Sequence, residues 1–287
     1  MRLFRRYNVV SYRFCRPDDI PLLTDYVNRC CTPEPALTVE DFKREVRQLN
    51  VWCSSCMIAS EGTDPVGVLI GAKRPDSNLV YRLGVRPEFR RQGHAAHMLE
   101  SLKQKLIKLG PPDIYAELPT EMTEALACFE KQGYQHVQTL IDYELVIPLE
   151  PISPENQTLI ENPPLDELLE HFSPLDQLSW LRSKTALQNC ADSLSVHAIA
   201  SMERVEACLI AKPAPLEGTH ELLGLRVHDP VEASFYLEIL LRSFCQPTRL
   251  PVRIPRLSPH EVSPSFLEKF GFKRHGEYIQ LHLLAKA

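Results

Sequence analysis

The sequence contains no long apolar run and no excess of basic residues. No stretch of 18 apolar residues occurs, and the arginine-bearing segment Met1–Val10 is not followed by an apolar run of signal-peptide length. The formal net charge is -5, which argues against a general nucleic-acid binder. These absences predict a soluble, cytoplasmic protein that binds neither membrane nor nucleic acid, so any cationic site must be local.

The cysteine patterns of a metal site or of a disulfide framework are also missing. The nine cysteines are an odd number, scattered over a chain that is too large to need disulfide staples. Cys53-Ser-Ser-Cys56 is the only CxxC, and no second cysteine or histidine pair lies near it in the sequence. We therefore expect free thiols, and we assign no metal.

Proline divides the chain almost in half. The segment Pro148–Pro164, PLEPISPENQTLIENPP, carries five prolines and few long apolar residues, which is typical of a linker. At 287 residues the chain exceeds the usual size of one domain. The sequence therefore predicts a first domain over residues 1–148, a linker over 149–164 and a second domain over 165–287.

The apolar periodicity predicts a mixed α/β order in each half. The first half is expected to form strands at 12–15, 53–59, 66–73, 79–85, 113–118 and 137–147 and helices at 18–28, 39–49, 93–109 and 120–132. The second half is expected to form helices at 165–172, 175–187, 230–244 and one ending at 269, and strands at 195–201, 204–212, 220–227, near 252 and 273–284. Short matches recur between the halves at offsets of 138 to 142 residues, such as Phe129-Glu-Lys-Gln-Gly-Tyr134 with Leu267-Glu-Lys-Phe-Gly-Phe272. Their common order favours a duplicated domain.

The most informative run is Leu83-Gly-Val-Arg-Pro-Glu-Phe-Arg-Arg-Gln-Gly-His-Ala-Ala96, where a strand ends, an arginine-bearing loop follows and a helix begins. The first N–H groups of a helix lack intrahelical partners, and the helix dipole favours an anion there. Gly93 has no Cβ to block the approach of a phosphate, and Arg90 and Arg91 add cationic donors. The run predicts a pyrophosphate site, whereas an ordinary strand–loop–helix with a solvated arginine turn is the alternative.

This run resembles the signature R/Q-x-x-G-x-G/A of the GCN5-related N-acetyltransferase (GNAT) superfamily, which Arg90, Gly93 and Ala95 fill. The resemblance covers about residues 10–147 and includes the order of elements. It implies an α/β fold of two tandem GNAT-like mixed-sheet domains, with acetyl-CoA as the acetyl-donor cosubstrate. The residues that it assigns to acetyl-CoA are Leu83, Gly84, Val85, Arg90, Arg91, Gln92, Gly93, His94, Ala95, Ala96 and Phe129.

Within that set the resemblance implies separate roles. The backbone of 83–85 pairs with the pantetheine arm, and the backbone N–H groups of 91–96 bind the pyrophosphate, with or without phosphate contacts from the Arg90 and Arg91 side chains. The side chains of His94 and His97 are expected on the helix surface. Phe129 stands where the family often has a tyrosine that protonates the departing thiolate, and Met122 stands where many members have a cofactor-binding asparagine.

Acetyl transfer to an amine requires a deprotonated nucleophile, because a lysine amine has a pKa of about 10.4 and an α-amine one near 8. Glu117 is the candidate base, since it precedes Phe129 by the spacing at which enzymes resembling the bacterial ribosomal-protein N-acetyltransferase place a glutamate. A carboxylate on a solvated strand face is the alternative. Tyr81 is a second candidate, to orient the substrate or relay a proton, although a tyrosine at the edge of the core would look the same.

The second half lacks the phosphate-binding pattern. An offset of 142 residues sets Glu232 opposite Arg90, Phe235 opposite Gly93 and Leu237 opposite Ala95. An acidic side chain repels phosphate and bulky residues fill the cradle, so a degenerate copy without acetyl-CoA is expected. It either shapes the acceptor site or merely covers a sheet edge.

The sequence thus predicts an acetyl-CoA-dependent N-acetyltransferase that acts on an amine of a small molecule, peptide or protein by direct transfer. A non-catalytic CoA-binding regulator or interaction module is the alternative. Neither the acceptor nor the oligomeric state is predicted.

Overall fold

The computed structural model describes residues 9–33, 35–145, 160–171, 178–214, 218–228, 233–245 and 250–285. The chain divides into two compact units. Unit 1 comprises residues 1–137 and 280–287, and unit 2 comprises residues 138–279. The mixed α/β sheet architecture expected from the sequence is confirmed.

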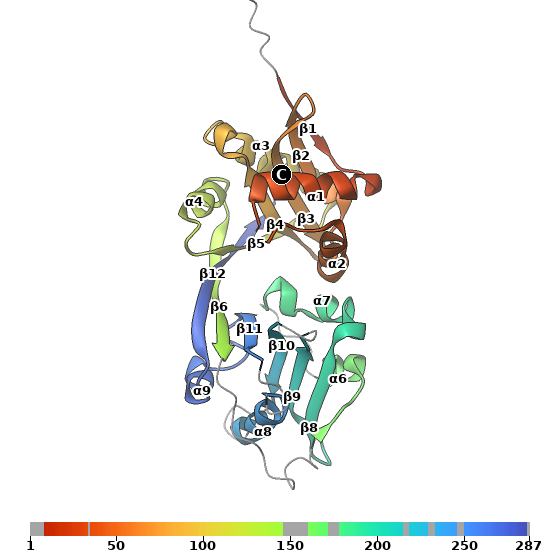
Figure 1. Cartoon of the computed structure of the whole chain (residues 1–287), viewed down its shortest axis with the longest axis vertical. Helices are drawn as coiled ribbons and strands as arrows, with labels where there is room; N and C mark the ends of the chain where they lie inside the picture. The colour runs from red at the N-terminus through yellow and green to blue at the C-terminus, as the bar shows by residue number, and fades with distance from the viewer. Residues whose placement is uncertain are drawn as a thin grey trace, which may run out of the picture. The chain divides into compact units, whose positions relative to one another are not determined.

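Unit 1 is a mixed sheet with helices on both faces (Figure 1). Its strands are β1 Val10–Phe14, β2 Met57–Glu61, β3 Asp64–Lys73, β4 Ser77–Val85, β5 Asp113–Pro119 and the end of β12 Lys273–Leu284, in the order β1-β2-β3-β4-β5-β12. Its helices are α1 Ile20–Cys31, α2 Val39–Leu49, α3 His94–Leu109 and α4 Thr123–Lys131. Neighbours from β1 to β4 are antiparallel, whereas β4 and β5 are parallel.

Two glycines show which helix packs on which face of unit 1. A Cβ on Gly84 would lie 2.5 Å from Cys31 Sγ, so only glycine lets the end of α1 pack this closely against β4. A Cβ on Gly67 would lie 3.0 Å from the Met98 side chain of α3. Because Gly67 pairs with Val85, next to Gly84, the two glycines lie on opposite faces, with α1 on one and α3 on the other.

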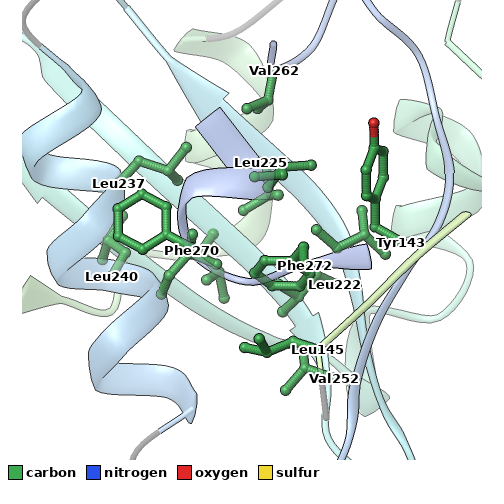
Figure 2. Packing of buried hydrophobic residues seen from close by; sticks show 14 of the residues in the cluster. Tyr143, Leu145, Leu222, Leu225, Leu237, Leu240, Val252, Val262, Phe270 and Phe272 are labelled. Atoms are coloured by element: carbon green, nitrogen blue, oxygen red, sulfur yellow. The ribbon is translucent and has the colours of Figure 1, made fainter. Parts of the chain in front are cut away.

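Unit 2 repeats this architecture with shorter helices. Its strands are β6 Gln135–Leu145 from residue 138 onward, β7 Ile160–Glu161, β8 Ser195–Ala200, β9 Val205–Lys212, β10 His220–Val227 and β11 Val252–Leu257, in the order β6-β11-β10-β9-β8-β7. Its helices are α6 Leu165–His171, α7 Lys184–Gln188, α8 Ala233–Cys245 and α9 Pro264–Lys269. Leucine and phenylalanine side chains from α8, from β10 and from the segment after α9 meet in one buried cluster (Figure 2), which includes Leu222, Leu225, Leu237, Phe270 and Phe272.

The strand register supports the duplication that the sequence repeats indicate. In unit 1 the register of β3 with β4 shifts and skips Tyr81. In unit 2 the register of β9 with β10 shifts and skips Leu223. These bulges are 142 residues apart, the offset between the corresponding strands that the sequence indicates.

Most expected elements are present, and two differ from the prediction. Cys53–Ser55 is a 3₁₀ turn rather than the start of a strand, and the strand begins at Met57. The helix expected over 175–187 is interrupted in its described part, where a 3₁₀ turn at Trp180–Arg182 precedes α7. The Ser183 side chain accepts a hydrogen bond from the Ala186 N–H and thereby starts a new helix.

The compact units do not follow the expected domain limits at 148 and 165. Residues 138–145 of β6 belong to unit 2, where β6 pairs with β11. Residues 280–285 belong to unit 1, where the Ala285 N–H donates to the Pro112 carbonyl at 2.9 Å. The expected linker lies outside the described residues up to 159, and residues 160–161 form β7. The limits at 148 and 165 describe where the sequence repeat begins and ends, and they stay a prediction. The compact units are defined by contacts in space, which divide the chain at other residues.

The cysteines with described side chains are free thiols, as expected. Cys56 is fully buried, and its burial raises the pKa of the thiol. Within the described ranges, no three histidine, cysteine or carboxylate side chains are grouped to hold a metal ion. None of the helices seen in those ranges is both long and apolar enough to cross a membrane.

Candidate cofactor and active site

The strands β4 and β5 separate at the end where the predicted site lies. Their paired register ends at Val80 and Ala116, whereas β4 continues to Val85 and stays paired with β3 up to that residue. The edge of β4 over 83–85 that faces away from β3 thus has no described strand pairing with β5. A ligand with amide groups can pair with such an edge.

The helix that follows begins with unused donors. In the described hydrogen bonds, none of the backbone N–H groups of 91–96 takes part, and the first helical bond joins the His97 N–H to the Gly93 carbonyl at 2.9 Å. Gly93 has φ +87°, and a Cβ placed on it would have no heavy atom within 4 Å. The first turn of α3 carries no acidic residue. These residues fit a diphosphate, because space, dipole and donors coincide.

The two arginines of the loop make different contacts. The Arg90 Nε donates to the carbonyl of Val85 at 3.0 Å and ties the loop to the strand end. Arg91 lies 3.4 Å from Glu124 at the start of α4, and both side chains are mostly exposed. Arg91 therefore remains accessible to a phosphate, while Arg90 holds the loop.

His94 is not on the helix surface, which corrects the expectation from the sequence. Its side chain is buried, with 8% exposed, and its Nδ1 lies 2.5 Å from the Tyr12 hydroxyl of β1. Burial and the neighbouring His97 lower the pKa of His94, and burial raises the pKa of Tyr12, so both shifts favour the neutral forms of the pair. The pair fixes the first turn of α3 against β1. His97 is exposed, as expected, and its ring lies 4.1 Å from that of Tyr12.

Glu117 is buried rather than solvated, with 8% exposed. Its Oε1 accepts a hydrogen bond from Gln280 of β12 at 3.1 Å. In the register with β3, Gly84 and Leu79 lie on the same face of the sheet, which α1 covers at Gly84. Leu79 pairs with Tyr115 of β5, and Glu117 is two positions further along β5, so Glu117 lies on that face too. Its charge also acts on Arg74, whose pKa burial lowers to about 10.

Tyr81 is the bulged residue of β4, immediately beyond the last residue that pairs with β5. Its hydroxyl accepts a hydrogen bond from Arg82 Nη2 at 3.1 Å, and the guanidinium carbon of Arg82 lies 4.8 Å from the ring centre. Arg82 also binds both carboxylate oxygens of Glu45 in α2, at 2.9 and 3.0 Å. The structure thus brings Tyr81 into a partly buried charged group on the α1 and α2 side of the sheet.

Phe129 is buried, with 1% exposed, and packs edge-to-face on Tyr134 at 4.9 Å between ring centres. The Tyr134 hydroxyl is buried with no hydrogen-bond partner among the described residues. Burial raises the pKa of Tyr134, which makes it a poor proton donor in place of the missing tyrosine. Burial also raises the pKa of Cys128 on the same helix, so that thiol is not an activated nucleophile.

Several residues of the site gave no signal in the sequence. Gln280 lies 163 positions after Glu117 and reaches it only through the pairing of the last strand. Glu45 sits on an amphipathic helix and is indistinguishable there from a solvated residue until Arg82 is placed opposite it. Arg82 gave the one hint in the sequence, because it is a charged residue inside an expected strand, and the structure shows that its Nε is buried.

The corresponding region of unit 2 differs at each described position. Glu232 lies outside the described residues. The offset of 142 makes Tyr236 the counterpart of His94, yet α8 already begins at Ala233. Phe235 is 53% exposed in place of Gly93, and Leu237 is buried in place of Ala95. A helix that starts earlier does not present its free N–H groups at the same place.

Comparison with known proteins agrees with this geometry. Residues 22–134 match the model of the Acetyltransferase (GNAT) family. The whole chain resembles a GCN5-related N-acetyltransferase from Sphaerobacter thermophilus, with 15% identity, a TM-score of 0.66 and coverage of 97% of this chain and 96% of that one. It also resembles one from Anabaena variabilis, with 13% identity, a TM-score of 0.63 and coverage of 97% and 73%.

A tandem GNAT protein from the clavulanic acid biosynthesis pathway is similar over 97% of this chain and 99% of its own, with 12% identity and a TM-score of 0.60. This chain therefore contains a domain of the GNAT family over residues 22–134. It has the fold of a tandem GNAT protein, and the family match lies within unit 1. Acetyl transfer is the general activity of this family.

Proposed function

We propose that unit 1 transfers an acetyl group from acetyl-CoA directly to an amine. The observation that carries the proposal is an unpaired edge of β4 beside a helix start whose backbone donors are unused. The backbone of 83–85 would pair with the amide groups of the pantetheine arm. The N–H groups of 91–96 would hold the diphosphate, with Arg91 as an added cation.

The faces of the sheet separate the two substrates. The diphosphate cradle belongs to α3, which packs on the Gly67 face, so the cofactor reaches the strand split from that side. The acceptor amine then approaches from the α1 and α2 side, where Glu117 and the Glu45–Arg82 pair lie. When bound, acetyl-CoA supplies a thioester carbonyl carbon with which the amine nitrogen forms the new bond.

Glu117 accepts the proton that the ammonium group must lose, directly or through water. The hydrogen bond from Gln280 holds its carboxylate in one orientation. Tyr81 orients the acceptor beside it through its hydroxyl, which Arg82 fixes. Because Phe129 has no hydroxyl, the thiolate leaves without a side-chain donor, which a thiol of pKa about 8.5 tolerates near neutral pH.

The buried, hydroxyl-free Phe129 also motivates a second candidate function, a CoA-binding regulator without turnover. Calorimetry of acetyl-CoA binding and amine-dependent release of CoA, measured on the full chain, separate the two functions. We expect saturable binding and release that depends on the amine across a panel of small amines and peptides. Binding without release from any acceptor would favour the regulator, and no binding would refute both.

The acceptor class requires a separate measurement. Incubation of the protein with acetyl-CoA and a cell extract, followed by mass spectrometry, distinguishes acetylated small amines from acetylated peptides or proteins. An Arg44→Ala variant controls for effects of mutagenesis and purification and should give the same products as the wild type. Arg44 is 71% exposed and pairs with Asp41 on the surface of α2. Products that also form with heat-denatured protein would not count as enzymatic.

A further inference from the structure

The second unit contains a strand split like that of unit 1, and a buried arginine lies in it. The strands β10 and β11 pair only at His220 with Val252 and at Glu221 with Arg253, although β10 continues to Val227. Pro255 in β11 has no N–H to donate, which prevents the ladder from continuing in its normal form. The carbonyl groups beyond the last pair therefore need other donors.

Arg182 provides those donors. Its Nη1 donates to the Leu222 carbonyl of β10 at 2.6 Å and, at a longer 3.4 Å, to the Pro255 carbonyl of β11. The guanidinium thus bridges the two strands where their own pairing ends. The Arg182 side chain is 0% exposed, so it lies within the unit and not at its surface.

The charge of Arg182 is balanced by Glu261, which lies between β11 and α9. Its carboxylate accepts bonds from Arg182 Nε at 2.8 Å and from Arg182 Nη2 at 2.8 Å. Arg226 of β10 donates to the same carboxylate. Burial alone raises the pKa of Glu261, but the two guanidinium groups outweigh it and lower that pKa, so Glu261 stays ionised.

The strand registers identify the counterparts of these residues in unit 1. The bulges at Tyr81 and Leu223 make Arg226 the counterpart of Gly84. The parallel pairs Asn78 with Ile114 and His220 with Val252 make Pro255 the counterpart of Glu117. The split that is open to a ligand in unit 1 therefore corresponds to the split that Arg182 bridges in unit 2.

We infer that Arg182 is an internal ligand of unit 2: its guanidinium bridges β10 and β11 where their pairing ends, closes that split to an acyl-CoA arm, and limits the chain to one acetyl-CoA site. The comparison with an acyl-CoA arm rests on the proposed function of unit 1. The bridging role of Arg182 does not depend on it.

Hydrogen exchange of the full chain, followed by mass spectrometry of peptides over 220–227 and 252–257, tests this role. In Arg182→Met we expect exchange in these two strands to rise by at least about 100-fold, because a buried ion pair is broken. Arg204→Met is the matched control, since Arg204 pairs with Glu206 at 3.1 Å in the same unit but is 40% exposed. An unchanged rate in β10 and β11 overturns the inference, as does an equal rise over β8 and β9, which would indicate only general stabilisation.

If Arg182→Met does not fold, Arg182→Lys replaces it, because a single ammonium keeps the charge but cannot bridge both strands and Glu261 together. A rise of about tenfold in β10 and β11 is then expected, and no rise overturns the inference. Titration of the wild-type chain should show that one equivalent of acetyl-CoA binds and that binding does not slow hydrogen exchange in residues 220–227. Binding of two equivalents would overturn the inference that the split of unit 2 is closed. No binding at all would refute the proposed function of unit 1, and the exchange experiment would still test the role of Arg182.

Discussion

In unit 1, β4 and β5 separate after Val80 and Ala116, and in unit 2, β10 and β11 separate after Glu221 and Arg253. Both splits lie beside a bulge in the first strand of the pair. In unit 1 the strand end is followed by a glycine turn and unused helix donors, and in unit 2 a buried arginine bridges the strands. The same backbone arrangement thus holds a buried side chain in unit 2 and, on the proposed function, admits a ligand in unit 1.

On the proposed function of unit 1, the side chains at the split, and not the sheet, determine whether the split binds a ligand. Gly84 leaves room for α1 against the strand end, whereas its counterpart Arg226 joins a buried ion cluster. Glu117 provides a titratable carboxylate, whereas its counterpart Pro255 provides none. A duplicated domain can therefore keep its fold after its site is lost, because folding depends on the strands and the core.

The largest expected effect comes from filling the cradle of unit 1. Gly93→Val places a branched side chain into open space at φ +87° and should weaken acetyl-CoA binding by about 10²–10³-fold. Gly62→Val is the matched control, because Gly62 also has positive φ and open space but lies in the turn between β2 and β3. Calorimetry and thermal unfolding of both variants separate binding from strain. Equal loss of binding in both would contradict the cradle.

A second test concerns the carboxylate that unit 2 lacks. Glu117→Gln should lower amine-dependent turnover by about 100-fold while acetyl-CoA binding changes by less than about twofold, since general bases contribute on this scale. Glu130→Gln, an exposed carboxylate on α4, is the control. A lower Tm with unchanged kcat would assign Glu117 a structural role only.

The buried cluster of unit 2 predicts a dependence of stability on acid. Because the pKa of Glu261 is lowered in the folded chain, its contribution to stability is present above the ordinary pKa of a glutamate and is lost as pH falls through the lowered value. Urea unfolding followed by exchange in 220–227 should show this loss, and Glu261→Gln should show a smaller dependence from a lower starting stability. A urea midpoint that stays constant as the pH falls below the ordinary pKa of a glutamate would argue that Glu261 is not ionised.

The smallest effect is expected at the surface of the cradle. Glu124 pairs with Arg91 at 3.4 Å, and both are exposed, so Glu124→Gln should free Arg91 and tighten acetyl-CoA binding by about twofold at low salt. Glu121→Gln, an exposed carboxylate just before α4, tests for a general charge effect. Tightening that persists unchanged at high salt would not be electrostatic.

Local sequence was sufficient to predict much of the fold. The helix Val39–Leu49 was predicted with its correct limits from its helical apolar spacing, and the structure shows a capping box of Thr38 and Asp41 at its start. The strand His220–Val227 was likewise predicted from its apolar run. The interrupted helix before α7 was missed, because Ser183 acts as a cap only once the chain turns there.

The candidate site was predicted in part. The position of Gly93 at the start of α3 follows from a local pattern of strand, loop and glycine, and its positive φ agrees with that pattern. The burial of His94 was not predicted, because its partner Tyr12 is on β1, far away in the sequence. A helix position gives no indication of the strand that will cover it.

The sequence by itself determined most of the elements, the repeat and the position of Gly93 at the start of α3, since each depends on residues close together in the chain or on matching segments. Only the tertiary structure decided that the last strand brings Gln280 to Glu117 and that Arg182 bridges β10 and β11. These contacts join residues far apart in the chain through strand pairing and burial. Their energies depend on which groups are removed from water together, and spacing along the sequence does not encode that.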